Sequence, residues 1–146
     1  MTPNALIEIV NVGFQYVGAE KVALKNISLS IQKGEVVAIV GHNGSGKSTL
    51  CKMLNALLLP AEGTVTVDGM DTRDEKNLLE IRRRVGMVFQ NPDNQLVTTI
   101  VEEDVGFGPE NLGVPPVEIR ARVDAALNEV EMSEYAEKAS HALSGG

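Results

Sequence analysis

The sequence predicts an α/β fold, and three observations support that prediction. Apolar and polar residues alternate near the N-terminus, which is typical of half-buried strands. Five consecutive apolar residues, 36–40, lead into a glycine-rich loop and then into a segment with helical periodicity. From about residue 91 onward the pattern is mainly helical. We therefore expect a core sheet, an antiparallel β-subdomain and a helical subdomain.

Length and composition favour one globular domain, or one piece of a larger domain. The chain has 146 residues, is 43% hydrophobic and carries a formal net charge of −7. Nucleic acids and anionic membranes bind basic faces, so no nucleic acid is expected as a partner. The start lacks the pattern of a signal peptide, and no apolar stretch approaches the roughly 20 residues that cross a bilayer. The single cysteine, Cys51, fits a reducing compartment.

The N-terminal segment predicts two antiparallel strands. Apolar residues alternate from Ile7 to Ile9 and again from Val10 to Tyr16, with a change of face that predicts a bulge or break. A second alternating run covers residues 27–31. A turn at residues 17–20 separates the two runs, which favours an antiparallel pair.

The middle of the chain predicts a core of strands and short helices. Residues 36–40 are expected to form a central parallel strand, buried on both faces. Apolar residues at helical spacing follow over 50–58, and Pro60 is expected to stop that helix. The remaining elements expected here are a strand at 64–67 closed by Asp68-Gly69, a short charged helix at 75–84, and a second core strand at 85–89.

Helices are expected in the last third of the chain, after a loop at residues 91–94. Pro116 is acceptable in a first helical turn. The apolar stripe of the helix that follows would consist of Ile119, Val123, Ala126, Leu127 and Val130.

Residues 41–48 match the Walker A, or P-loop, pattern G-x-x-x-x-G-K-S/T. Its glycines let the backbone curl so that N–H groups point at phosphate oxygens, and the following helix adds its positive end. Lys47 would supply a charge for the β- and γ-phosphates, and Ser48 a hydroxyl for Mg²⁺. The alternative is a turn that merely connects a strand to a helix. The nucleotide-contacting candidates here are Gly41, Asn43, Gly44, Ser45, Gly46, Lys47, Ser48 and Thr49.

Three further segments stand in a suggestive order around this loop. Tyr16 ends the first predicted strand, Gln90 ends the strand at 85–89, and Leu143-Ser144-Gly145-Gly146 closes the chain. Alone, each has a plainer interpretation: a packed aromatic, a polar strand end, and a loop before a helix. Together with the P-loop, they resemble the nucleotide-binding domain of ABC transporters, a fold with a P-loop NTPase core.

That resemblance implies roles for particular residues. Tyr16 would stack on the adenine ring of ATP. Gln90 would help place Mg²⁺ and the attacking water, and its loop would face a membrane subunit. Ser144, Gly145 and Gly146 would cap the γ-phosphate of ATP held by the opposite subunit. The catalytic candidates are therefore Lys47 and Gln90, and the metal candidates are Ser48 and Gln90.

A narrower resemblance involves residues 85–95 and 107–111. They are similar to the ATP-binding subunits of energy-coupling factor transporters, which import vitamins and cobalt or nickel ions. The loop at 91–94 resembles the first of the two paralogous ATPases of such systems. This implies a paralogous or identical ATP-binding partner, a transmembrane coupling subunit and a substrate-binding membrane subunit. It also implies a peripheral location on the cytoplasmic face of the cell membrane.

The given sequence stops inside the signature motif of the family it resembles. We expect residues 1–90 to form the β-subdomain and P-loop core, and residues 91–146 to form an incomplete helical subdomain. The family's Walker B strand, catalytic glutamate and switch histidine are not among these residues, so we expect the intact protein to hydrolyse ATP and this stretch to bind it weakly or not at all. The rival hypotheses are a nucleotide-binding fragment that does not hydrolyse ATP and a soluble ABC ATPase of DNA repair or translation.

Overall fold

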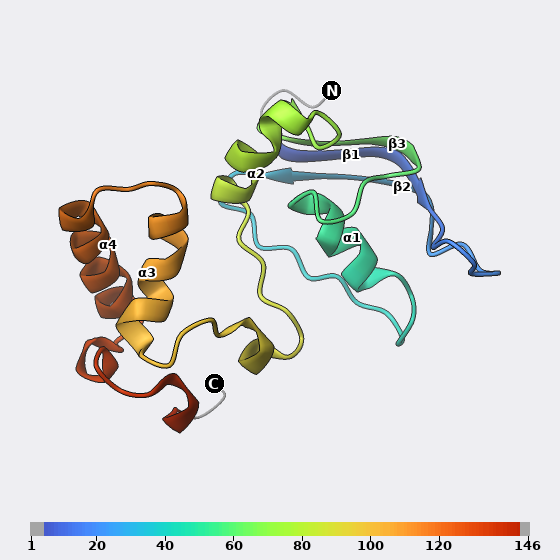
Figure 1. Cartoon of the computed structure of the whole chain (residues 1–146). Helices are drawn as coiled ribbons and strands as arrows, with labels where there is room; N and C mark the ends of the chain where they lie inside the picture. The colour runs from blue at the N-terminus through green and yellow to red at the C-terminus, as the bar shows by residue number, and fades with distance from the viewer. Residues whose placement is uncertain (1–4, 144–146) are drawn as a thin grey trace. The chain divides into compact units, whose positions relative to one another are not determined.

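The computed structural model describes residues 5–143, and these divide into two compact units that meet in the sequence between Met87 and Val88 (Figure 1). The first unit contains the sheet together with helices α1 (Lys47–Leu54) and α2 (Leu78–Arg84). The second unit contains helices α3 (Val101–Asn111) and α4 (Pro116–Glu129). Within residues 5–143, no helix combines the length and the apolar composition that crossing a bilayer requires.

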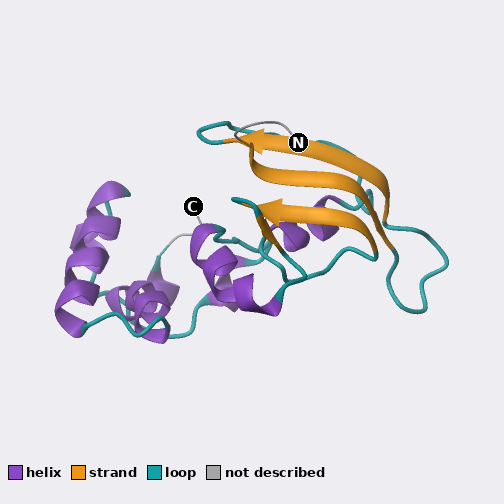
Figure 2. Cartoon of the chain, turned by 90° about the horizontal axis from the view of Figure 1, so that it is seen from above, coloured by secondary structure: helices purple, strands orange, loops and turns teal. Residues whose placement is uncertain are grey.

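The sheet of the first unit is antiparallel throughout. Its strands are β1 (Ala5–Phe14), β2 (Leu24–Gln32), β3 (Glu62–Val67) and β4 (Met70–Asp71), in the spatial order β2-β1-β3-β4. Figure 2 shows the three longer strands as one orange layer. The predicted antiparallel β-subdomain is therefore confirmed, and it includes β3, which pairs with β1 on the side opposite β2.

Strand β1 carries the bulge that its change of face predicts. Ile9 pairs with Leu29 and Val12 pairs with Ile27, so β1 has one more residue than β2 between these pairs. The backbone bends at Asn11, which has a φ of 50°. The bulge turns both Ile9 and Val12 into the core although three positions separate them.

The same bulge presses against β3 at Gly63. The φ of Gly63 is 75°, and a Cβ atom there would lie 2.2 Å from the carbonyl oxygen of Val10 and 2.4 Å from that of Asn11. Both obstacles are backbone atoms, which a side-chain rotation cannot remove. Glycine is therefore required where the backbone of β3 approaches the bulge of β1 so closely.

Helix α1 packs on the sheet and ends earlier than the sequence predicts. Ala56 adopts a φ of 55°. Its N–H donates to Met53 O at 3.2 Å, and the N–H of Leu57 donates to Lys52 O at 2.9 Å. This pair of hydrogen bonds is the Schellman motif, which satisfies the last carbonyls of a helix. The prediction that Pro60 stops the helix is therefore wrong, because the left-handed residue ends it first.

The core of the first unit lies between the sheet, α1 and α2. A 3₁₀ turn, Glu75–Asn77, precedes α2, and Asp74 caps it by accepting a hydrogen bond from the N–H of Lys76. Asp68 and Gly69, with φ angles of 48° and 77°, make the tight turn between β3 and β4. The buried residues of this core are Ile7, Ile9, Val12, Leu24, Leu50, Met53, Val65, Val67 and Ile81.

Two predicted core strands are absent from the described residues. Within 5–143, neither 36–40 nor 85–89 belongs to a strand. Val36 is 97% exposed, Val40 89% and Val88 82%. A run of apolar residues favours burial, but a parallel strand also needs a hydrogen-bonded neighbour. No described segment supplies that neighbour, so the predictions of a central parallel strand at 36–40 and of a second core strand at 85–89 are both wrong for this structure.

The second unit is a helical hairpin with short 3₁₀ turns. These turns are Pro92–Gln95, Ser133–Tyr135 and Ser140–Ala142. Val101, Val123 and Leu127 are buried between α3 and α4, and Leu143 packs against them. Pro116 begins α4, as predicted. Of the predicted stripe, Val123 and Leu127 are buried, whereas Val130 lies beyond the helix end and is exposed.

A returning segment of the chain covers the start of α3. The N–H groups of Val101 and Glu102 donate to Lys138 O and Ala136 O at 3.1 and 2.9 Å. These amides belong to the first helical turn, which has no acceptors within its own helix. The carboxylate of Asp104 accepts hydrogen bonds from the N–H groups of Val97 and Thr98 at 2.7 and 3.0 Å. Backbone from 136–138 and one side chain of α3 thus fix the loop that enters the helix.

Candidate functional site

The glycine-rich loop lies immediately before α1. Gly44 and Gly46 have φ angles of 79° and 88°, and the N–H of Ser45 donates to His42 O at 3.2 Å. The first bond of the helix runs from the N–H of Leu50 to Gly46 O at 2.9 Å. The N–H groups of residues 47–49 therefore point out of the helix start, where they are suited to an anion.

Lys47 and Ser48 are presented on that first turn. Lys47 Nζ donates to Gly41 O at 2.8 Å and to His42 O at 2.9 Å, so its ammonium lies across the mouth of the loop. Ser48 is exposed. The hydroxyl of Ser45, at 3.5 Å, is its third and longest partner. An ammonium held only by neutral oxygens is available to an anionic oxygen, which forms a stronger, charge-assisted hydrogen bond.

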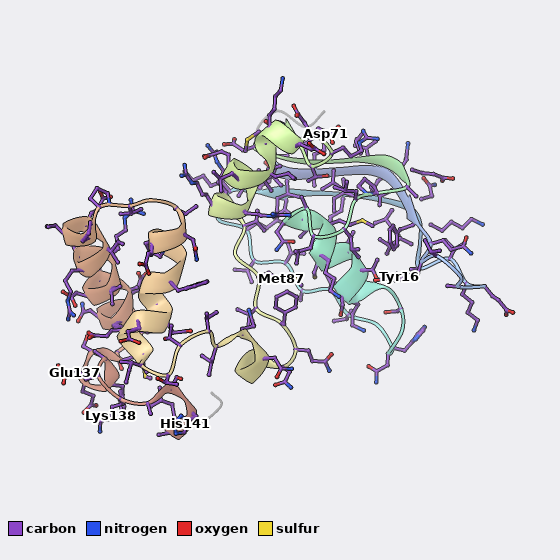
Figure 3. The ribbon with its side chains drawn as sticks, viewed as in Figure 1. Tyr16, Asp71, Met87, Glu137, Lys138 and His141 are labelled. Carbon is purple, nitrogen blue, oxygen red and sulfur yellow. The ribbon has the colours of Figure 1, made fainter. Side chains whose placement is uncertain are left out.

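Tyr16 contacts the same helix start from the loop after β1, two residues beyond the strand end at Phe14 and not within the strand as predicted (Figure 3). Its hydroxyl lies 3.1 Å from Thr49 Oγ1. Its ring meets the ring of Phe14 edge to face, with centroids 4.9 Å apart and planes at 89°. The structure thus brings together two of the predicted nucleotide residues, Tyr16 and Thr49, that are 33 positions apart in the chain.

Gly46 is held by a contact that the sequence did not reveal. A Cβ atom on Gly46 would lie 2.5 Å from Ala23 O and 2.9 Å from Leu24 Cδ2. The loop therefore rests directly on the start of β2. Ala23 and Leu24 precede the alternating run predicted at 27–31 and belong to no motif, so only the fold places them against the loop.

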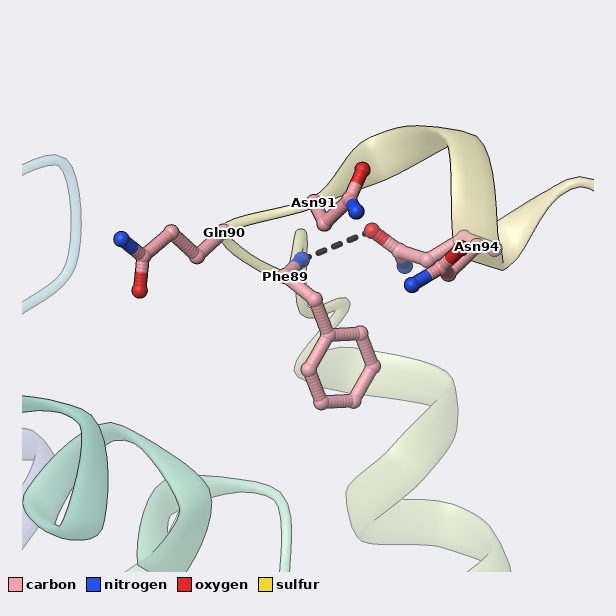
Figure 4. Close-up of a pocket in the computed structure, with 5 residues that line it drawn as sticks. Phe89, Gln90, Asn91 and Asn94 are labelled. Carbon is pink, nitrogen blue, oxygen red and sulfur yellow. Dashed lines mark hydrogen bonds between the residues drawn. The ribbon is translucent and has the colours of Figure 1, made fainter.

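Gln90 belongs to the second unit. It lines a cavity of about 510 Å³ together with Phe89, Asn91, Asn94 and Gln95 (Figure 4). The side chain of Gln95 shapes this loop, because its Oε1 accepts a hydrogen bond from the N–H of Phe89 at 2.7 Å. In Figure 4 the Gln90 side chain points away from Asn91 and Asn94.

The remaining predicted site residues are those of the signature motif and the metal ligands. Ser144, Gly145 and Gly146 lie outside the described residues. Among residues 5–143, no group of three histidine, cysteine, aspartate or glutamate side chains is placed to hold a metal ion. The chemistry of the loop nevertheless fits Mg²⁺, which keeps several waters and needs only one or two protein oxygens besides phosphate. Ser48 would be such a ligand.

The match to known proteins decides the family. The model of the ABC transporter family matches residues 24–146. The chain belongs to the ABC transporter family. Its fold is that of ABC nucleotide-binding domains, a mixed α/β fold with an antiparallel sheet, and the predicted fold class is therefore confirmed.

Curated relatives within the ABC transporter family include ATP-binding proteins of two named systems. The energy-coupling factor transporter ATP-binding protein EcfA1 of Clostridium novyi is 64% identical over 144 residues, which cover 97% of this chain and 51% of the relative. The cobalt import ATP-binding protein CbiO of Syntrophus aciditrophicus is 50% identical over 141 residues, which cover 97% of this chain and 50% of the relative. The chain spans about half the length of these relatives. The predicted resemblance to the first energy-coupling factor paralogue is confirmed.

Solved structures of ABC proteins have the same fold as this chain. The structure of cbiO1 from Clostridium perfringens, described as part of the ABC transporter complex cbiONQ, superposes with a TM-score of 0.84 at 38% identity, covering 97% of this chain and 56% of that one. A dimeric ATP-binding cassette in a post-hydrolysis state, bound to ADP and Pi, superposes with a TM-score of 0.80 at 33% identity, covering 95% and 63%.

Proposed function

We propose that this chain is part of the ATP-binding subunit of an energy-coupling factor or cobalt-type importer, and that its loop at 41–49 binds Mg-ATP. The observation that carries the proposal is the cradle, by which we mean the groups gathered at the start of α1. Lys47, Ser48 and the free amides of the first turn of α1 face outward from one loop, and Tyr16 contacts that turn. Phosphate, metal and base would each find a matching group there.

Each residue has a chemical task in this proposal. The amides of 47–49 and the ammonium of Lys47 hold the phosphates, and the Ser48 hydroxyl contributes to the Mg²⁺ site. Gly41, Asn43, Gly44, Ser45 and Gly46 shape the cradle. Tyr16 stacks on adenine. Gln90 helps place Mg²⁺ and water, and Ser144, Gly145 and Gly146 cap the γ-phosphate in the opposite subunit.

The intact protein would work as a dimer with a paralogous or identical subunit. The dimeric cassette that this chain resembles carries ADP and Pi, which supports ATP hydrolysis in such a dimer. Residues 1–90 would serve as β-subdomain and P-loop core, and 91–146 as helical subdomain. The dimer would sit at the cytoplasmic face of the membrane, beside a transmembrane coupling subunit and a substrate-binding subunit.

A groove between α3 and α4 is our candidate surface for the coupling subunit. It has a volume of about 480 Å³, with an apolar floor that includes Phe107, Ile119 and Val123. Glu103 and Glu110 line it and form no ion pair with any described residue. Arg120 does not offset them, because Asp124 and Glu102 accept its hydrogen bonds and thereby raise its pKa.

The charge of the second unit supports a basic occupant for this groove. Residues 88–146 carry eleven acidic and three basic side chains, a formal charge of −8, whereas residues 1–87 carry +1. A helix with apolar and basic residues would therefore match both the floor and the rim.

The nucleotide site is tested by binding of a fluorescent ATP analogue in Mg²⁺ to the native protein, purified with the subunits that accompany it. We expect saturable binding, weakened about 10- to 100-fold by Lys47→Ala because a charge-assisted hydrogen bond to phosphate is lost. Thermal unfolding of both proteins controls for folding. Equal affinity of the two proteins would contradict the proposal.

The coupling surface is tested by charge reversal. The double substitution Glu103→Lys and Glu110→Lys is expected to lower co-purification with the membrane subunits severalfold, because it opposes a basic partner. Glu129→Lys, on the exposed last turn of α4 and outside the groove, is the matched control. Retention of normal assembly by the double variant would exclude this groove.

A further inference from the structure

The hydroxyl of Tyr16 is placed for more than supporting a stacked base. Tyr16 is 43% exposed, whereas Thr49, whose Oγ1 lies 3.1 Å from the Tyr16 hydroxyl, is only 7% exposed. The ring of Tyr16 is also braced edge to face by Phe14. The oxygen end of Tyr16 is therefore fixed against the start of α1, while part of the side chain stays open to a ligand.

The direction of this hydrogen bond has a chemical consequence. Each hydroxyl has one hydrogen to donate and two lone pairs that accept. Thr49 lies in the first turn of α1, two residues after Lys47, where unpaired amides suit an anion. An anionic oxygen can only accept, so a Thr49 hydroxyl facing a phosphate donates its hydrogen to that phosphate. Tyr16 must then be the donor to Thr49.

We propose that Tyr16 is a positioning residue for the polyphosphate, acting through Thr49. Its O–H donates to Thr49 Oγ1 and so directs the Thr49 hydrogen toward a phosphate oxygen. Consecutive hydrogen bonds of this kind polarise and strengthen one another. This inference rests on the proposed ATP-binding function and adds to it, because the tyrosine oxygen would serve the phosphate end of the ligand rather than the base.

The test uses a ligand without a base. Binding of Mg-ATP and of Mg-tripolyphosphate to the native protein with its accompanying subunits is measured by titration calorimetry. Tyr16→Phe keeps the ring and removes only the oxygen. We expect it to weaken both ligands by a similar factor, about 3- to 10-fold, the usual effect of one hydrogen bond. Tyr135→Phe, at the other tyrosine of the chain, is expected to change neither affinity.

A double-mutant cycle tests whether the effect passes through Thr49. In a Thr49→Val background, Tyr16→Phe is expected to cause no further loss, whereas in a Thr49→Ser background its full effect returns. Loss of ATP affinity with unchanged tripolyphosphate affinity would overturn the proposal, as would additive effects of Tyr16→Phe and Thr49→Val.

Lys47→Ala, measured in parallel, separates this inference from the proposed function. If Lys47→Ala weakens both ligands and Tyr16→Phe does not affect tripolyphosphate, only the role of the hydroxyl is overturned. If the wild-type protein binds neither ligand, the ATP-binding function and this inference are overturned together.

Discussion

Gly63→Ala is expected to lower the free energy of unfolding by about 2 to 5 kcal/mol, the sum of a left-handed backbone penalty and of overpacking. A Cβ atom at this position would lie 2.2 Å from Val10 O and 2.4 Å from Asn11 O. Because both atoms are backbone, relief requires β1 and β3 to separate at the bulge. Urea unfolding followed by circular dichroism measures the change.

Gly69→Ala is the matched control for this prediction. Gly69 has a φ of 77°, close to the 75° of Gly63, but a Cβ atom there would meet nothing within 4 Å. Its substitution should cost only the backbone penalty, about 1 to 2 kcal/mol. Equal losses in the two variants would mean that the contact between the bulge and β3 contributes nothing beyond backbone strain.

Gly46→Ala is expected to reduce binding of the fluorescent ATP analogue by more than about 100-fold, because a displacement of about 1 Å at such a site has an effect of that order. A Cβ atom on Gly46 would meet Ala23 O at 2.5 Å, at a φ of 88°. The start of α1 must then move away from β2. Lys47, Ser48 and the amides that face the ligand would move with it.

Gly34→Ala separates this displacement from general destabilisation. Gly34 has a φ of 82° and an open surrounding, so its substitution should cost stability and leave nucleotide affinity unchanged. Tight nucleotide binding by a folded Gly46→Ala protein would show that the ligand does not depend on this loop geometry.

Local signals predicted the parts of the molecule that local physics determines. The P-loop and the start of α1 follow from glycines and a helix start that are adjacent in sequence. The bulge in β1 follows from the change in the apolar–polar alternation after Ile9. One extra residue in a strand moves all later side chains to the other face, so such a change predicts a bulge. Pro116 marks the start of α4 because its missing N–H belongs to the turn that needs no intrahelical bond.

The failures have two causes: a dependence on distant residues and, at the end of α1, a local backbone conformation that the residue type does not predict. Segments 36–40 and 85–89 are apolar enough for strands, yet a strand forms only beside another strand. The early end of α1 depends on a left-handed alanine, Ala56, for which the sequence carries no warning. The bond between Tyr16 and Thr49 and the contact of Gly46 with Ala23 depend on how the sheet folds over the loop.

The backbone pairing at the start of α3 closes the chain between residues 100 and 139 into a loop. The bridge between Ile100 and Ala139 joins the two ends of the stretch that contains both helices. The tip of that stretch, at Gly113, is exposed, and a Cβ atom on Gly113 would meet nothing within 4 Å. When the base of a loop is already closed, lengthening its tip costs only about 0.6 kcal/mol per doubling. Gly113 is therefore the place where a fluorescent reporter or a foreign peptide can be inserted while the pairing of Ile100 with Ala139 stays intact.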